Sequence, residues 1–278
     1  MIVTVAYVAD RAVLKPLIIS CFALLYHASQ DDILDLHIVY EGFTKRDRDR
    51  VHRALHRASR PFQLTWHEAD LSPYVALRPF HGSRMNYVKL HLPYLIESKY
   101  ILYIDADTLP LLDPGELVSG GTAGHILAAC SWDVTADNAQ QREWFAAEGL
   151  RPETPILNSG VMLIDRAKWL DRGMTEACLS VGHRCTTHAG DQVLINTVLR
   201  GDFMPLRTRY NIRAGANVDV SGYSGILHFV GSVKPWEFWG HWTHKNYPIW
   251  RKWATLGGER ATTFSIRGAM PRILSRFR

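Results

Sequence analysis

The stretch Tyr100 to Leu109 reads Y-I-L-Y-I-D-A-D-T-L, an apolar run that ends in two carboxylates. Residues 100–104 are β-branched or aromatic except for Leu102, apolar throughout and too few for a helix, so they predict a strand that is covered on both faces. Such a strand lies in the middle of a sheet. Because side chains alternate along a strand, Asp105 and Asp107 would point to the same side, about 6.6 Å apart if the chain stays extended.

Two interpretations of this aspartate pair are open. The carboxylates could cap the turn formed by residues 108–110. Alternatively, they hold a divalent cation at the carboxyl end of a central strand, where open α/β sheets place their ligands. The sequence of residues 100–109 does not distinguish these interpretations, so evidence from later parts of the chain is needed.

The composition is that of a globular protein. The chain has 278 residues, of which 47% are hydrophobic and 21% charged, which excludes a disordered chain and a membrane bundle. No apolar run approaches membrane-spanning length, and no basic region precedes the first expected strand, so we expect a cytoplasmic protein. The formal net charge of +5 is modest. The four cysteines (Cys21, Cys130, Cys178 and Cys185) show no C-x-x-C spacing, and we expect reduced core thiols and no zinc site.

Strand-like and helix-like segments alternate along the chain, which predicts the α/β class. The expected strands are residues 2–8, 36–40, 62–66, 100–104, 126–130, 157–165 and 226–227, and the expected helices are residues 14–25, 44–55, 85–96, 138–149, 166–181 and 191–199. No repeat or linker interrupts residues 1–235, so we treat them as one domain.

The helix that Thr44 is expected to cap begins a basic run over residues 45–60, with Lys45 and six arginines against Asp47 and Asp49. Such a run is most often a solvated face. A nucleic-acid surface is the weaker alternative, because aromatic residues for base stacking are missing. We therefore expect no nucleic-acid partner.

The composition changes in residues 236–278, which we treat as a C-terminal extension. It holds five of the nine tryptophans, namely Trp236, Trp239, Trp242, Trp250 and Trp253. We expect these rings to fill the core of the extension. The tail, residues 266–278, alternates apolar residues with arginines, so we expect a basic amphipathic helix on an anionic membrane surface, with simple disorder as the alternative.

Two further polar clusters interrupt apolar elements. One combines Asn158 and Ser159, just before Gly160, with residues 190–192 at the start of an expected helix. The other follows the strand-like Ile226 and reads H-F-V-G-S-V-K-P-W from His228 to Trp236. A single histidine is usually a hydrogen-bonded loop residue, but the neighbours of this one favour a site. Gly231 lets the backbone approach a ligand, and Lys234 is a point charge suited to phosphate. Two carboxylates with one imidazole favour manganese over magnesium.

A strand that ends in D-x-D-x-T-L also resembles the nucleophile strand of haloacid-dehalogenase-type phosphatases. Asp105 would then attack phosphorus and Asp107 would move a proton. That family's strand normally opens the domain, whereas three expected strands precede it here. The later acidic pair is also missing, because Ile195 stands where the second carboxylate belongs.

Four motifs together, I-L-Y-I-D-A-D-T-L, L-N-S-G-V-M-L-I-D, G-D-Q-V-L-I-N and H-F-V-G-S-V-K-P-W, resemble those of the family 8 retaining glycosyltransferases, which include bacterial lipopolysaccharide galactosyl- and glucosyltransferases. The resemblance covers about residues 2–253. It implies a GT-A fold, a Rossmann-like mixed sheet flanked by helices, with a UDP-sugar donor and Mn²⁺, or Mg²⁺ in its place. The expected donor is UDP-glucose or UDP-galactose, and the acceptor a hydroxyl of lipopolysaccharide or another surface glycan or glycolipid.

The resemblance also implies roles for individual residues. Asp105, Asp107 and His228 would hold the metal, while Gly231 and Lys234 would contact the phosphates. The full set expected to bind the donor is Ala9, Asp10, Lys89, Asp105, Ala106, Asp107, Asn158, Ser159, Asp191, Gln192, His228, Gly231 and Lys234. The catalytic pair within it is Asp191, expected on the sugar hydroxyls, and Gln192, expected near the anomeric carbon.

The sequence departs from the family pattern in three places. Arg11 follows Asp10 where asparagine and tyrosine are common, Lys89 replaces an arginine, and Val193 stands where some members carry a carboxylate. The last difference removes one proposed covalent nucleophile, so we expect same-face attack assisted by the leaving phosphate. The alternative is a catalytically silent nucleotide-sugar-binding or membrane scaffold protein. In either case we expect a place in the cytoplasm or on the inner face of the membrane.

Overall fold

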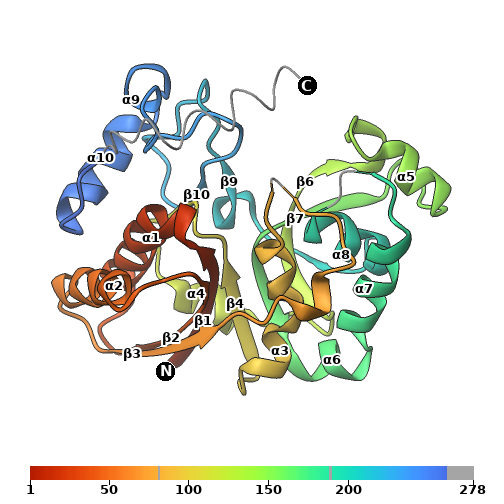
Figure 1. Ribbon diagram of the computed structural model, residues 1–278, viewed down its shortest axis with the longest axis horizontal. Coiled ribbons are helices and arrows are strands. Elements are labelled where there is room, and N and C mark those ends of the chain that lie inside the picture. Colours follow the sequence, from red (N-terminus) through yellow and green to blue (C-terminus); the bar gives the residue numbers. More distant parts are fainter. Residues whose placement is uncertain (81, 188–189, 262–278) are drawn as a thin grey trace.

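The computed structural model describes residues 1–80, 82–187 and 190–261, which form a mixed α/β fold with helices on both faces of a sheet (Figure 1). The described strands are β1 (Ile2–Asp10), β2 (Ile33–Glu41), β3 (Phe62–Glu68), β4 (Tyr100–Ile104), β5 (Thr108–Pro110), β6 (Leu127–Val134), β7 (Pro155–Asp165), β8 (Met204–Pro205), β9 (Ile212–Arg213) and β10 (Ile226–His228). The described α-helices are α1 (Leu14–His27), α2 (Lys45–Arg57), α3 (Leu92–Leu95), α4 (Pro114–Ser119), α5 (Arg142–Ala147), α6 (Arg166–Asp171), α7 (Met174–Arg184), α8 (Asp191–Leu199), α9 (Gly240–Thr243) and α10 (Tyr247–Leu256).

The larger sheet has the strand order β3-β2-β1-β4-β7-β6-β8. Strands β3, β2, β1 and β4 are parallel, whereas β7 runs antiparallel to both β4 and β6, so the sheet is mixed. Strand β4 is in the middle, as its uninterrupted apolar sequence predicts. The apolar run of residues 100–104 therefore forms the central strand of the larger sheet.

Two apolar clusters lie on opposite faces of this sheet. The first joins the sheet to α1, α2 and α10, and the second joins it to α3, α6, α7 and α8. Figure 1 shows α1 and α2 on one side of the molecule and α6, α7 and α8 on the other. Helix α1 is buried over Leu14 and 16–25 because it is covered by other elements as well as by the sheet.

The smaller sheet has the order β5-β10-β9, with β10 antiparallel to β5 and parallel to β9. Strand β5 starts four residues after the end of β4. The chain thus passes directly from the larger to the smaller sheet through residues 105–107. This crossing brings the carboxyl end of β4 next to the end of β10.

Several helices differ from the sequence prediction. Residues 85–96, expected as one helix, form a 3₁₀ helix, Met85–His91, followed by the short α3; Pro93, without an N–H, lies in the first turn of α3. The helix expected over 166–181 is divided into α6 and α7 at Gly173, whose φ is 56°. The helix expected over 138–149 shortens to α5. The predicted N-cap Thr44 is confirmed, and it forms a capping box with Asp47.

The tryptophans of the extension behave in two ways. Trp236, Trp250 and Trp253 are buried in the cluster that includes α1, as expected. Trp239 and Trp242 are each 60% exposed, so the expectation of a buried ring is wrong for these two. Trp239 is the N-cap of α9 and Trp242 lies within it, and this single turn is too short to bury both rings.

The expected tail helix, residues 266–278, lies outside the described residues. Among the residues that are described, no helix has the length and apolarity needed to cross a bilayer. All four cysteines are buried and free, as predicted.

Candidate active site

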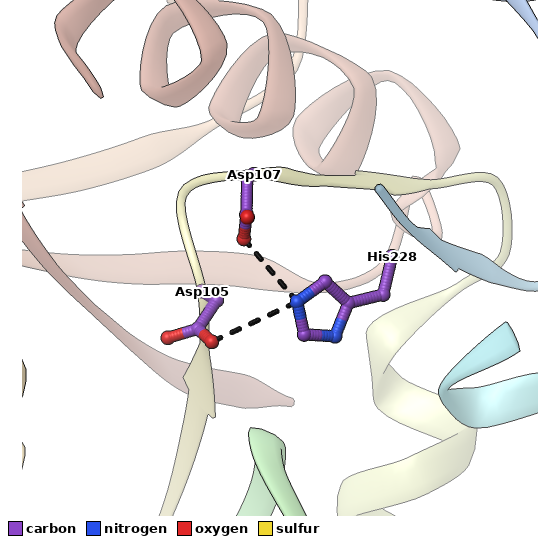
Figure 2. A group of neighbouring side chains, drawn as sticks. All are labelled: Asp105, Asp107 and His228. Atoms are coloured by element: carbon purple, nitrogen blue, oxygen red, sulfur yellow. Dashed lines mark ion pairs between the residues drawn. The ribbon is translucent and has the colours of Figure 1, made fainter. Parts of the chain in front are cut away.

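Three side chains converge where the two sheets meet. Asp105 follows β4, Asp107 precedes β5, and His228 ends β10. One oxygen of each carboxylate and one imidazole nitrogen all lie within 4.8 Å of one another. Figure 2 shows both aspartates directed at the same ring nitrogen: His228 Nε2 lies 3.3 Å from Asp107 Oδ1 and 3.9 Å from Asp105 Oδ2. Two oxygens and one nitrogen in this arrangement suit a divalent cation such as Mn²⁺ or Mg²⁺.

The local backbone differs from the extended pair that strand alternation predicts. The strand ends at Ile104, and the next residues form a turn in which the Thr108 hydroxyl donates to the Asp105 carbonyl at 2.9 Å. The Asp105 N–H still donates to Gly160 O on β7 at 2.7 Å. The turn brings the Asp107 carboxylate beside Asp105 without requiring both residues to belong to one strand.

Each aspartate also pairs with a lysine through its other oxygen. Lys89 Nζ lies 3.2 Å from Asp105 Oδ1, and Lys234 Nζ lies 2.8 Å from Asp107 Oδ2. Burial tends to raise the pKa of Asp107, but the Lys234 ammonium brings that pKa well below its usual range. Asp107 is therefore ionised, and one of its oxygens faces Nε2 of His228.

Lys89 is buried, with 3% of its surface exposed, and it bridges two carboxylates. Its Nζ lies 2.9 Å from Asp191 Oδ2, in addition to its contact with Asp105, and 4.5 Å from the centre of the Tyr103 ring. Burial lowers the pKa of Lys89, but the two carboxylates outweigh it and raise the pKa above its usual value. The Tyr103 hydroxyl donates to Asp105, and burial followed by the Asp105 charge raises the pKa of Tyr103 well above 10.

A second polar group lies at the start of α8. The Asp191 carboxylate accepts from the Ser159 hydroxyl at 2.6 Å and from Asn86 Nδ2 at 3.2 Å. The Gln192 Oε1 atom accepts from Asn158 Nδ2 at 2.9 Å and from the Ser159 N–H at 3.4 Å. The motif that contains Asn158 and Ser159 and the motif that contains Asp191 and Gln192 thus form one hydrogen-bonded unit.

A cavity of about 240 Å³ opens beside the aspartates. Ala9 and Asp10 at the end of β1 line it, together with Ala106. The Asp10 carboxylate accepts from the Ala12 N–H at 2.9 Å, so this aspartate also caps the turn that follows the strand. Gly231 has a φ of +90°, with open space where a Cβ would lie.

Four residues of this site were not identified from the sequence: Tyr103 and Asn86, which donate to the aspartates, and Gly160 and Asn211. Gly160 lies against the His228 ring, and Asn211, which directly precedes β9, hydrogen-bonds His228 Nδ1 at 3.1 Å and Asn158 Oδ1 at 2.8 Å. Gly160 lies in one of the four motifs, but the motif does not show which side chains pack against this glycine. Asn211 has no motif around it, and only the pairing of β9 with β10 brings it to the site.

Comparison with known proteins gives distant relatives over most of the chain. General stress protein A of Bacillus subtilis (strain 168) is 23% identical over 262 residues, which cover 84% of this chain and 89% of that protein. The lipopolysaccharide 1,2-glucosyltransferase of Escherichia coli (strain K12) is 26% identical over 163 residues, which cover 53% of this chain and 47% of that protein.

Solved structures share the fold. The galactosyltransferase LgtC, in complex with donor and acceptor sugar analogs, superposes with a TM-score of 0.70 at 18% identity, over 95% of this chain and 97% of that one. Mouse xyloside xylosyltransferase 1 gives a TM-score of 0.61 at 16% identity, over 82% of this chain and 97% of that one. The fold is therefore GT-A, as expected. The family model described as glycosyl transferase family 8 matches residues 4–240, and with that match the chain belongs to glycosyl transferase family 8.

Proposed function

We propose that this glycosyltransferase moves glucose or galactose from a UDP-sugar to an acceptor hydroxyl, with retention of configuration at the anomeric carbon. The observation that carries the proposal is the meeting of Asp105, Asp107 and His228 beside Lys234. Lys89 connects this group to Asp191 at the start of α8. Membership of glycosyl transferase family 8 argues against the phosphatase alternative, in which Asp105 would be a nucleophile. The ion pair between Asp105 and Lys89 agrees with a role for this carboxylate as a metal ligand.

The donor diphosphate binds at the aspartate pair in this proposal. A divalent cation, Mn²⁺ in the first place, would be held by Asp105, Asp107 and His228 and would neutralise charge on the leaving diphosphate. Lys234 and the backbone at Gly231 contact the phosphates, and Ala9, Asp10 and Ala106 contact the nucleoside. Each oriented donor at developing charge contributes about 3 kcal/mol to lowering the barrier. These roles agree with the cavity beside Ala9 and Asp10.

The donor sugar lies against Asn158, Ser159, Asp191 and Gln192. The Asp191 carboxylate is held by Lys89 and the Ser159 hydroxyl, so it suits binding of sugar hydroxyls better than nucleophilic attack. Retention usually proceeds through a carboxylate nucleophile. We assign same-face attack instead, with the leaving phosphate oxygen taking the proton of the acceptor hydroxyl and Gln192 close to the anomeric carbon.

The acceptor is a glycan or glycolipid of the lipopolysaccharide type. The relative from Escherichia coli is a lipopolysaccharide glucosyltransferase, which supports this class. Residues 1–235 form the catalytic domain and residues 236–278 the extension, whose tail binds an anionic membrane surface at the cytoplasmic face. Deletion of residues 266–278 should weaken binding to vesicles of phosphatidylglycerol while sparing UDP binding, and equal vesicle binding would refute the membrane role.

A donor screen tests the function. UDP release from UDP-glucose and from UDP-galactose is measured with Mn²⁺ or with a chelator, in the presence of a lipopolysaccharide-core acceptor. We expect turnover with one donor, loss of turnover on chelation, and a retained anomeric configuration in the product by proton NMR. Asp105→Ala should abolish turnover. Asp31→Ala should leave it unchanged, because Asp31 is exposed and precedes β2, at the opposite end of the parallel strands from Asp105.

The outcomes separate the competing functions. Full activity in Asp105→Ala would overturn the site assignment. Binding of UDP-sugar without any UDP release would favour the silent binding protein. An inverted product would remove the same-face mechanism while leaving the donor site in place.

A further inference from the structure

Asn211 connects the metal-binding half of the site to the donor-sugar half. Its side chain is fully buried, and its backbone carbonyl accepts a hydrogen bond from Trp132 Nε1 at 2.9 Å. Its Oδ1 lies 3.1 Å from Nδ1 of His228, and its Nδ2 lies 2.8 Å from Oδ1 of Asn158. The amide therefore has one partner on each side.

The direction of these hydrogen bonds is fixed by a backbone amide. Gly160 N–H, which can only donate, donates to Asn158 Oδ1 at 3.0 Å. Asn158 therefore presents an oxygen to Asn211, and Asn211 must meet that oxygen with its own NH₂ group. The Asn211 oxygen then faces the imidazole of His228.

That orientation determines the tautomer of the histidine. An oxygen opposite Nδ1 of His228 requires a proton on Nδ1, which leaves a lone pair on Nε2. Nε2 is the atom that faces both carboxylates, Asp107 Oδ1 at 3.3 Å and Asp105 Oδ2 at 3.9 Å. The tautomer set by Asn211 is thus the one that can bind a cation between them.

The chain of hydrogen bonds continues in the other direction. Asn158 Nδ2 donates to Gln192 Oε1 at 2.9 Å, and the Ser159 N–H donates to the same oxygen at 3.4 Å. With its oxygen engaged twice, Gln192 keeps its NH₂ group for other partners. One polarised chain thus extends from His228 through Asn211 and Asn158 to Gln192.

We propose that Asn211 is a positioning residue for both halves of the site: it holds His228 in the Nδ1–H tautomer for cation binding, and it orients Asn158 and Gln192 toward the donor sugar. The inference rests on the proposed function for the second of these roles. Removing a hydrogen-bond partner of a metal-binding histidine typically costs about 10- to 100-fold in metal affinity or activity.

Two substitutions separate the roles. Asn211→Asp keeps an oxygen for His228 Nδ1–H but has no N–H for Asn158 Oδ1. We expect this variant to bind Mn²⁺ with a Kd within about threefold of the parent and to lose about 10- to 100-fold in kcat. Asn211→Ala loses both contacts, so its Kd for Mn²⁺ should also rise about 10- to 100-fold.

The Mn²⁺ affinity is measured by titration calorimetry without donor, and folding is checked by thermal unfolding. Asn246→Asp is the matched control, because Asn246 is also a buried asparagine but bonds the backbone of Val218 and Val220. It should lower stability and leave the Mn²⁺ affinity unchanged. Nitrogen NMR of the parent protein labelled in histidine reports the tautomer of His228 directly and needs no buried substitution.

The results distinguish this inference from the proposed function. A parent protein that binds Mn²⁺ and releases UDP, but whose His228 carries the proton on Nε2, overturns the role of Asn211 and leaves the function standing. Equal Mn²⁺ affinity in Asn211→Ala and the parent does the same. An Nδ1–H tautomer in a parent that releases no UDP supports the first role and removes the proposed function.

Discussion

The α-carbon of Gly160 lies directly against the imidazole of His228. A Cβ added at Gly160 would lie 2.3 Å from Cε1 and 2.7 Å from Nδ1 of that ring, and 2.9 Å from Asp105 Oδ2. Real Cβ atoms do not approach other atoms so closely. The glycine in the β7 motif therefore serves to leave room for two of the three converging side chains.

Gly160→Ala should accordingly displace His228 or Asp105 and weaken the cation site. Overpacking of this kind costs about 1–3 kcal/mol of stability, so the fold survives while the geometry changes. We expect a clear rise in the Kd for Mn²⁺, measured by titration calorimetry. Gly215→Ala is the control, since no atom lies within 4 Å of a Cβ there, and equal affinities in the two variants would contradict the argument.

Lys89→Met tests the buried bridge between Asp105 and Asp191. The methionine removes the charge that compensates two carboxylates, and breaking a buried pair in this way costs about 3–5 kcal/mol. The free energy of unfolding at pH 7, measured in urea, should fall by that order. The control Lys168→Met breaks a pair with Asp165 whose lysine is 41% exposed, and it should cost less than about 1 kcal/mol. A loss no larger at Lys89 than at Lys168 would mean that the bridge contributes little.

The lowered pKa of His244 predicts that the free energy of unfolding decreases in mild acid. Burial and then the nearby Lys234 charge lower the pKa of His244 to about 4, from 6.5 in an unfolded chain. Because the unfolded state takes up the proton first, the stabilising contribution is present above pH 6.5 and declines as the pH falls toward 4. Between pH 7 and pH 5 this amounts to about 1–2 kcal/mol.

The measurement compares urea unfolding of the parent and of His244→Gln at both pH values. Glutamine can still accept from the Asn246 N–H, which donates to His244 Nδ1 at 3.2 Å in the parent. The variant should lose less stability than the parent on acidification. An identical pH dependence would assign the acid sensitivity to other groups.

Trp250 and Trp242 should differ strongly in their effect on stability. Trp250 is fully buried and its ring lies 5.7 Å from that of Phe229, next to His228, so Trp250→Ala should cost about 3–5 kcal/mol. Trp242 is 60% exposed, and Trp242→Ala should change stability by no more than about 0.5 kcal/mol. Thermal unfolding of both variants checks this, and a similar decrease in Tm would mean that α9 is packed more firmly than its exposure indicates.

The sequence predicts much of the fold where the pattern is local. Strand β4 and helix α8 have the expected limits, because an apolar run and an apolar stripe of fixed period each specify one element. Residues 85–96 were predicted wrongly, since helical spacing alone does not distinguish an α-helix from the tighter 3₁₀ turns that form here. The exposure of Trp239 and Trp242 likewise depends on packing that spacing does not reveal.

The candidate site was predicted only in part, for a comparable reason. The metal-binding candidates could be predicted because they are carboxylates and an imidazole at the ends of strands. The structure brings these three residues, Asp105, Asp107 and His228, together. Asn211 lies in no motif, and its place depends on the two-residue pairing of β9 with β10. Gly160 is informative only through the atoms it faces, which belong to distant parts of the chain.

The passage of the chain from one sheet to the other between β4 and β5 has a mechanical consequence. Asp105 directly follows β4 of the larger sheet, whereas Asp107 directly precedes β5 and His228 ends β10 of the smaller sheet, so an ion held by all three would fasten the sheets together. By linkage, a cation at 100 times its Kd adds about 2.7 kcal/mol to the docked state. Local opening of the smaller sheet would then be suppressed, and amide hydrogens in β9 and β10 would exchange more slowly when the site is filled.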